Sequence, residues 1–329
     1  MLSFEVVEVY PVIDEHNRTG DLPVEVALSV FGKKILGIWI KGGSMKLYLR
    51  FVLFVAVLTA VVPLAFSQNP GLPQEKVTAV YGQNIHYFEV GQGPTVILLH
   101  GLGGAKEFWL ANVGALASKY HVYAIDQIGF GQSDKPLINY KVATFADFLH
   151  GFMQAEKIAK ATLVGNSFGG WIALDFTAQY PEMVDKLVLV DSAGLSWGRG
   201  PVVDLNPTTM AGWRVLVESV FYDKKIVTDQ VVLQGFSDHL HKNDGYTIDR
   251  TLAGFVAENQ FEDAKLASIH APTLVIWGRE DELVGMDRGQ KLHDGIPGAQ
   301  MVVFEHCGHV PQIEKPAEFN QALVEFLGK

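Results

Sequence analysis

The sequence predicts an α/β fold in which a mostly parallel central sheet is covered by helices on both faces. Apolar runs of strand length alternate with stretches of helix length between residues 95 and 194, and the same alternation returns over residues 271–329. Such alternation is typical of parallel sheets, because consecutive parallel strands need a long crossover between them. Of the 329 residues, 48% are hydrophobic and 19% charged, which is enough to bury one large core.

The individual elements can be placed in chain order. A β-hairpin is expected first, with strands over residues 77–81 and 85–90 and with residues 82–84 as its turn. Buried strands are then expected over residues 95–99, 121–125, 162–164, 187–190, 273–277 and 301–304. Helices are expected over residues 106–118, 145–158 and 168–179, with a further helix at the C-terminus. These strands and helices predict one core domain in two parts, residues 68–194 and residues 271–329.

The alternation is interrupted over residues 195–270, which contain no convincing buried strand. Helices are expected there over residues 210–220, 228–240 and 248–258, forming a cap above the C-terminal ends of the strands. Six large apolar side chains either line a substrate pocket beneath this cap or pack the cap onto the core: Trp197, Met210, Trp213, Phe221, Phe236 and Phe255. Their number indicates a small-molecule substrate with an apolar part.

Ser167 is the candidate nucleophile. It lies at the centre of the hexapeptide GNSFGG over residues 165–170, between an apolar strand and an apolar helix. A serine in this G-x-S-x-G pattern sits on a strained turn that projects its hydroxyl above the sheet. Gly165 and Gly169 are required because side chains there would collide with the turning backbone. The alternative is an ordinary glycine-rich turn between a strand and a helix.

A nucleophilic serine needs a base, and the base needs an acid that orients it. Asp281 follows the apolar run 273–277 and is the candidate acid, with Asp191 as a rival at the end of the strand 187–190. His309 is the candidate base, in a loop before the terminal helix. His306 is nearer to the strand end and is the rival base. His309 is favoured because a glycine and a proline fix the loop around it.

These motifs, with HGLGG at 100–104 and DQIGFGQS at 126–133, resemble those of the α/β-hydrolase superfamily over about residues 75–329. The resemblance implies Ser167 as nucleophile, Asp281 as acid and His309 as base. It also implies an oxyanion hole formed by the backbone N–H groups of Leu102 and Phe168. One departure is Gly285, where many relatives carry a proline after the acid; it concerns the rigidity of the acid loop.

The expected reaction is hydrolysis of a carboxylic ester, thioester or lactone with an apolar moiety, through an acyl-enzyme on Ser167. It needs no metal and no organic cofactor. The segments at 165–170, 307–309 and 318–320 also resemble hydrolases that cleave a carbon–carbon bond in dienoate ring-fission products, although Val310 and Ile313 stand where those enzymes tend to carry tryptophan. A third alternative is a ligand receptor that keeps the triad and turns over slowly.

Charge and cysteine content exclude several other classes. The net charge is −10 and no lysine or arginine cluster is present, so no nucleic-acid partner is expected. The single cysteine excludes an intrachain disulfide. The oligomeric state stays open.

Residues 45–67 have the pattern of a signal peptide. A basic stretch precedes the apolar run 51–62, and small residues stand at positions 65 and 67, which predicts cleavage after Ser67 and an exported, periplasmic or secreted protein. The alternative is an uncleaved membrane anchor, and this segment is the only expected contact with a membrane. Residues 1–44 are expected to be a non-native upstream extension with Met45 as the initiator, or else a cytoplasmic segment before an anchor.

Overall fold

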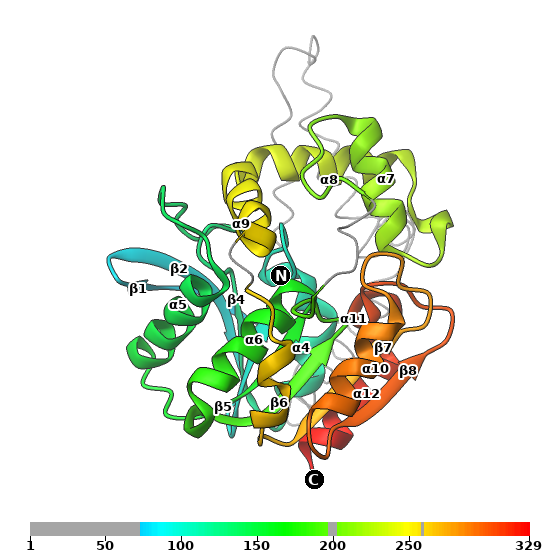
Figure 1. Ribbon diagram of the computed structural model, residues 1–329. Helices are drawn as coiled ribbons and strands as arrows, with labels where there is room; N and C mark the ends of the chain where they lie inside the picture. Colours follow the sequence, from blue (N-terminus) through cyan, green and yellow to red (C-terminus); the bar gives the residue numbers. More distant parts are fainter. Residues whose placement is uncertain (1–72, 197–202, 258–259) are drawn as a thin grey trace, which may run out of the picture. The chain divides into compact units, whose positions relative to one another are not determined.

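The central element of the structure is an eight-stranded sheet with the strand order β1-β2-β4-β3-β5-β6-β7-β8 (Figure 1). This computed structural model describes residues 73–329 except 197–202 and 258–259. The strands are β1 Gln74–Val80, β2 Gln83–Val90, β3 Thr95–Leu99, β4 His121–Ile125, β5 Ala161–Asn166, β6 Val184–Val190, β7 Thr273–Gly278 and β8 Gln300–Phe304. Only β1 with β2 and β2 with β4 pair antiparallel, and the other five pairs are parallel. The expected fold class is thereby confirmed.

The hairpin turn is shorter than the sequence suggested. Strands β1 and β2 pair up to Val80 and Gln83, so the turn consists of Tyr81 and Gly82 alone. Both turn residues have positive φ, 52° and 79°. A two-residue turn with two positive φ values matches the twist of the strands, which is why the ladder extends beyond the expected turn over residues 82–84.

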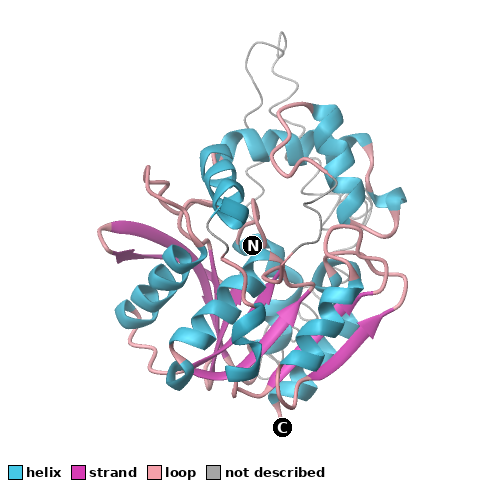
Figure 2. Cartoon of the chain, in the orientation of Figure 1, coloured by secondary structure: helices cyan, strands magenta, loops and turns pink. Residues whose placement is uncertain are grey.

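Helices cover both faces of the sheet, as Figure 2 shows. The helices of the core are α4 Leu110–Leu116, α5 Val142–Ala155, α6 Phe168–Gln179, α10 Met286–Gly295, α11 Pro311–Glu314 and α12 Pro316–Leu327. Short 3-10 helices are η2 Lys106–Trp109, η3 Pro181–Met183 and η5 Asp263–Ser268. The helix expected over residues 106–118 is therefore divided into η2 and α4. The helix expected over residues 168–179 is observed with the same bounds, and α10 was not anticipated.

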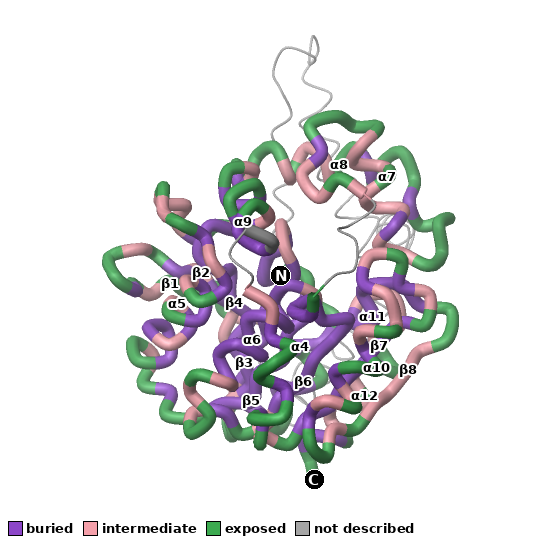
Figure 3. The backbone as a smooth tube through the Cα atoms, in the orientation of Figure 1, coloured by how far each residue is buried: buried purple, intermediate pink, exposed green. Residues whose placement is uncertain are grey.

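Two apolar clusters hold the helices on the sheet. On β3, Ile97 and Leu99 face the cluster that contains α5, α6 and α10, whereas Val96 and Leu98 face the cluster that contains α4 and α12. This alternation is the period of two expected for a strand covered on both sides. Figure 3 shows the central strands of the sheet buried, whereas the edge strand β1, the outer helices and the cap are largely exposed.

The cap consists of helices α7 Met210–Val220, α8 Asp229–Lys242 and α9 Gly245–Ala257, with the short η4 Lys224–Ile226 between α7 and α8 (Figure 1). The side chains of Thr209 and Thr228 cap α7 and α8 by accepting hydrogen bonds from backbone N–H groups of the first turn. Helix α7 has the expected bounds. The segments 1–44 and 45–67, and Trp197, lie outside the described residues. Within the described ranges, no helix is both long and apolar enough to cross a membrane.

Candidate active site

Ser167 sits on the turn between β5 and α6. Its φ is 56° and its ψ is −119°, a conformation that costs a non-glycine residue energy and that recurs at functional turns. Its backbone N–H donates a 2.9 Å hydrogen bond to the carbonyl of Val190 on β6. A Cβ on Gly165 would overlap the backbone of Gly169, and a Cβ on Gly169 would overlap the carbonyl of Leu99. Both glycines are thus required by close backbone approach, as expected.

His309 and Asp281 are hydrogen-bonded to each other, with 2.7 Å between Nδ1 and Oδ2. Asp281 lies in the loop after β7 and His309 in the loop after β8, and both are buried. The other oxygen of Asp281 accepts hydrogen bonds from the backbone N–H groups of Leu283 (2.8 Å) and Val284 (3.0 Å). An ionised Asp281 requires the proton on Nδ1 of His309, which leaves Nε2 as the acceptor. Ser167 and His309 line the same cavity.

The acid loop is well defined despite its departure from the family pattern. Gly285 has φ −57°, the value that a proline would impose. Its carbonyl accepts a 2.9 Å hydrogen bond from the N–H of Arg288 in the first turn of α10. Together with the two backbone donors on Asp281, this fixes the loop without a proline.

The rival base is placed differently from His309. The side chain of His306 is 72% exposed, and its nearest acidic partner is Glu280, at 3.9 Å. It is not among the residues that line the cavity of Ser167. The geometry therefore favours His309 as the partner of Ser167.

The proposed oxyanion donors are the backbone N–H groups of Phe168, next to Ser167, and of Leu102, in the loop after β3. Phe168 is the first residue of α6, so its N–H has no partner within the helix and carries the positive end of the helix dipole. Leu102 follows β3 in the facing loop, and both residues line the cavity. His100 orders that loop: its Nδ1 lies 2.7 Å from the carbonyl of Gly101, and its Nε2 accepts from the N–H of Gln127. Burial lowers the pKa of His100 to about 4, so the ring is neutral at pH 7.

A cavity of about 270 Å³ lies between the core and the cap. Its lining is mostly apolar, and comprises Gly101, Leu102, Gly103, Phe108, Asn166, Ser167, Phe168, Ala193, Leu205, Trp213, Leu216, Val217, Val220, Phe221, His239, Ile248, Phe255, Leu283, Val284, His309, Val310 and Ile313. The described lining residues include no lysine or arginine. The cavity can therefore hold an apolar group close to Ser167, whereas a carboxylate in it would find few cationic partners.

Three of the expected pocket residues line the cavity, namely Trp213, Phe221 and Phe255. The other two that the structure describes, Met210 and Phe236, are not among the lining residues of this cavity. Met210 begins α7, one turn beyond the cavity, and is 44% exposed. Phe236 packs its ring against that of Trp213, with 6.4 Å between the ring centres. Spacing along a helix identified the correct face but not how far the cavity extends along it.

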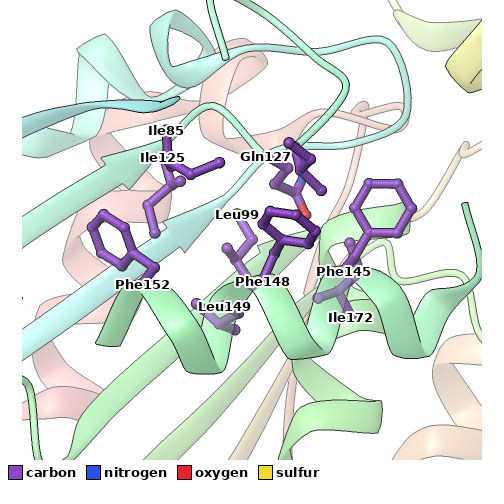
Figure 4. A pocket seen from close by; sticks show the side chains of 10 residues that line it. Ile85, Leu99, Ile125, Gln127, Phe145, Phe148, Leu149, Phe152 and Ile172 are labelled. Atoms are coloured by element: carbon purple, nitrogen blue, oxygen red, sulfur yellow. The ribbon is translucent and has the colours of Figure 1, made fainter. Parts of the chain in front are cut away.

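A second, smaller void lies beneath α5, as Figure 4 shows. Its volume of about 20 Å³ is close to that of one water molecule. It is lined by Ile85, Leu99, Ile125, Gln127, Ile128, Phe145, Phe148, Leu149, Phe152 and Ile172. With no titratable side chain in its lining, this void is a packing gap of the core.

Two polar residues near the site were missed by sequence reasoning. Asn166 donates from Nδ2 to the carbonyls of Val190 (3.2 Å) and His309 (3.1 Å), and so ties the nucleophile turn to the base loop. The sequence feature that could have identified Asn166 is a side-chain amide at the end of an otherwise apolar strand. Glu314 accepts from the N–H of Gly308 and from the N–H of Tyr222, both at 2.8 Å. Burial raises the pKa of Glu314, and no sequence pattern points to its role.

Asp191, Asp281 and His309 form a group of potential metal ligands, each offering one atom within 4.8 Å of the others. In the described part of the chain it is the only such group. The 2.7 Å contact between Asp281 and His309 is a hydrogen-bond length, so an ion would have to displace this bond. The arrangement is therefore that of a hydrogen-bonded acid–base pair with a second carboxyl beside it.

Several known proteins are similar to most of this chain. Residues 96–322 match the model of the alpha/beta hydrolase family. A 2-hydroxy-6-oxo-6-phenylhexa-2,4-dienoate hydrolase from Comamonas testosteroni is 34% identical over 265 residues, covering 74% of this chain and 91% of that protein. A crystal structure of a meta-cleavage product hydrolase superposes with a TM-score of 0.71 at 32% identity, covering 77% and 97% of the two chains. A membrane phospholipase A superposes with a TM-score of 0.70 at 28% identity, covering 87% and 98%.

Proposed function

The chain belongs to the α/β-hydrolase family, and we propose that this hydrolase uses Ser167 to cleave a carbon–carbon bond beside a ketone in a dienoate-type substrate. The observation that carries the proposal is the pairing of His309 with Asp281 beside the cavity that Ser167 lines. Ester hydrolysis is the reaction first expected from the sequence. The dienoate hydrolases and meta-cleavage product hydrolases among the similar proteins favour carbon–carbon cleavage instead.

The mechanism follows from the positions of the three side chains. Ser167 Oγ attacks the ketone carbon while Nε2 of His309 takes its proton. Asp281 holds the proton on Nδ1 of His309 and stabilises the imidazolium that forms. The oxyanion accepts hydrogen bonds from the N–H groups of Leu102 and Phe168, a type of interaction worth about 3–4 kcal/mol per donor in related enzymes.

Collapse of the tetrahedral intermediate breaks the carbon–carbon bond. The electron pair leaves on a carbon that is conjugated with the second carbonyl of the keto tautomer, and the His309 imidazolium donates its proton to that fragment. The product is an acyl ester on Ser167. Water, deprotonated by His309, then hydrolyses this ester and restores the enzyme. The apolar cavity suits an acyl part derived from an aromatic compound.

A dienoate also carries a carboxylate, and His239 is our candidate contact for it. Apart from His309, it is the only residue in the described cavity lining whose side chain can be cationic near neutral pH. Its ring stacks on Trp213, with 4.8 Å between the ring centres, and its Nδ1 lies 3.6 Å from the buried carboxylate of Asp244. We therefore propose His239 as the carboxylate contact.

Ester hydrolysis is the second candidate function. It is supported by the lack of lysine and arginine in the described cavity lining and by the similarity to a membrane phospholipase A. An ester needs the same nucleophile, base and oxyanion hole, and it requires no contact for a substrate carboxylate.

A direct comparison of two substrates separates these functions. Steady-state kcat/KM should be measured for 2-hydroxy-6-oxo-6-phenylhexa-2,4-dienoate and for p-nitrophenyl butyrate, with Ser167→Ala as the control. We expect the dienoate to be the better substrate by about 10- to 100-fold, since its carboxylate gains a contact of about 1.5–3 kcal/mol at His239. A higher kcat/KM for the ester would select the second candidate. Binding without repeated turnover of either would instead identify a slow receptor.

A further inference from the structure

Asp191 is a buried carboxyl group that the proposed mechanism does not use. It follows Val190 directly at the C-terminal end of β6 and has φ 42°, a left-handed conformation that is uncommon for aspartate. Its side chain has no exposed surface. One oxygen accepts a 2.9 Å hydrogen bond from the N–H of Gly278, whereas the other, Oδ2, is buried without a hydrogen-bond partner.

Asp281 is in a very different state although the two carboxyls are neighbours. Side-chain atoms of Asp191, Asp281 and His309 lie within 4.8 Å of one another. Both oxygens of Asp281 accept hydrogen bonds, two from backbone N–H groups and one from His309. The three donors thus stabilise the negative charge of an ionised Asp281. Asp191 as an anion would have one donor for two buried oxygens, beside a second negative charge.

The other titratable groups around Asp191 reinforce this difference. The charge of Glu314 on α11 also opposes ionisation of Asp191, and Cys307 is a buried thiol whose own pKa is raised. Burial, followed by the charge of Asp281, raises the pKa of Asp191 well above its usual range. A neutral Asp191 would carry an O–H, and the carboxylate of Asp281 is the strongest acceptor near it.

We propose that Asp191 and Asp281 share one negative charge, with Asp191 as the protonated member that positions Asp281 and replaces it when its charge is removed. The proposal rests on the proposed function in one respect, namely that His309 is the base. In the native pair, the proton of Asp191 points to Asp281 and no second charge acts on His309. When Asp281 becomes neutral, the main charge opposing ionisation of Asp191 is gone, and Asp191 becomes the anion that stabilises the imidazolium.

A double-mutant cycle on the full-length protein tests the replacement. Asp281→Asn, Asp191→Asn and the double variant are compared with the wild type on p-nitrophenyl butyrate and on the phenyl dienoate. Asp281→Asn alone should lose much less than the roughly 10⁴-fold typical of a triad without a spare acid. Adding Asp191→Asn to it should cost about a further 100-fold, against less than about tenfold in the wild-type background.

The pH profile provides a readout that a merely structural role would not produce. In Asp281→Asn, Asp191 must lose its proton before it can act, so kcat should rise with pH across a range in which the wild type is flat. Equal costs of Asp191→Asn in both backgrounds, or a flat profile for Asp281→Asn, would overturn the replacement role.

Infrared difference spectroscopy tests the protonation state independently of turnover. At neutral pH the wild type, and equally Ser167→Ala, should show the C=O stretch of a neutral carboxylic acid that is lost in Asp191→Asn. Absence of this band in the wild type would overturn the shared charge. Because the band does not depend on catalysis, a failure of Ser167 as nucleophile would be recognised separately, by undiminished turnover of Ser167→Ala.

Discussion

The backbone N–H of His309 donates a 2.8 Å hydrogen bond to the carbonyl of Val220, the last residue of cap helix α7. The base loop and the cap are thus bonded directly. Glu314 provides a second link, because it accepts from Gly308 in the base loop and from Tyr222 just beyond α7. A Cβ on Gly308 would come within 2.5 Å of the Val220 carbonyl, so this approach requires glycine. The position of the cap and the orientation of His309 are therefore coupled.

Removal of Glu314 should expose this coupling. Glu314→Ala leaves two backbone N–H groups without their acceptor, which should lower the free energy of unfolding by about 1–3 kcal/mol. Loss of the link between cap and base loop should lower kcat by about 10–100-fold and should change KM less. Urea unfolding and steady-state kinetics measure the two effects. Glu318→Ala, an exposed glutamate on α12, is the matched control. An unchanged kcat with reduced stability would show that the link is structural only.

Ser167 should be the residue that reacts with a fluorophosphonate probe. Its strained turn and its place at the N-terminus of α6 favour attack on phosphorus as they do on carbon. Mass spectrometry should find the label on Ser167 alone, and Ser167→Ala should be unlabelled, inactive and folded. Label on another serine of the active protein would contradict the assignment.

His309 and His306 should differ sharply on substitution. His309→Ala removes the group bonded to Asp281, so kcat should fall by several orders of magnitude, by analogy with other triads. His306→Ala removes an exposed ring outside the cavity and should change kcat less than about threefold. Both variants should be assayed on the same substrate after their secondary structure has been compared by circular dichroism. A larger loss in His306→Ala would reverse the order of the two histidines.

Glu262 should make stability depend on pH. Its side chain is buried beside Asp175, and the two share Lys265, at 2.9 Å from Glu262 and 2.8 Å from Asp175. Burial, with the charge of Asp175, raises the pKa of Glu262 from 4.5 to about 7. The folded protein therefore holds a proton that the unfolded chain releases above pH 4.5. The free energy of unfolding should fall as pH rises from 4.5 to about 7, by at most roughly 3 kcal/mol.

Glu262→Gln keeps the shape of the side chain and removes its titratable carboxyl group. Urea unfolding across this pH range should show a flatter profile for the variant than for the wild type. Glu182→Gln, at an exposed glutamate of η3, should retain the wild-type slope. If Glu262→Gln has the wild-type slope too, then Glu262 is not the group that titrates.

The sequence predicted the features that depend on local pattern. The strands of the core could be recognised from short apolar runs, and the turn at Ser167 from two glycines whose spacing is set by backbone contact. The links through Glu314 could not be anticipated. Glu314 lies 92 residues from Tyr222 in the chain and binds backbone N–H groups, which every non-proline residue possesses.

The cap also contains features that the sequence pattern could not predict. Helix α7 had the expected bounds, yet Met210 and Phe236 are not among the residues that line the cavity of Ser167. Periodicity defines the face of a helix, but the part of that face that meets the cavity depends on how the helix packs. The same holds for the proton on Asp191, which depends on its distance from Asp281 in the folded chain.

The last expectation concerns the N-terminal segment. We propose that residues 45–67 direct export and are removed after Ser67, so that the mature chain begins at Gln68. Every strand of the described sheet follows this cleavage site, beginning with β1 at Gln74. A chain that starts at Gln68 should therefore be soluble, as stable as the full-length protein and equally active. If residues 45–67 were retained, the apolar run 51–62 would need a membrane or a protein partner. Intact mass of protein recovered from the cell envelope measures the start directly. A mass that includes Met1, or a shortened chain that fails to fold, would show that the first segment is part of the functional protein.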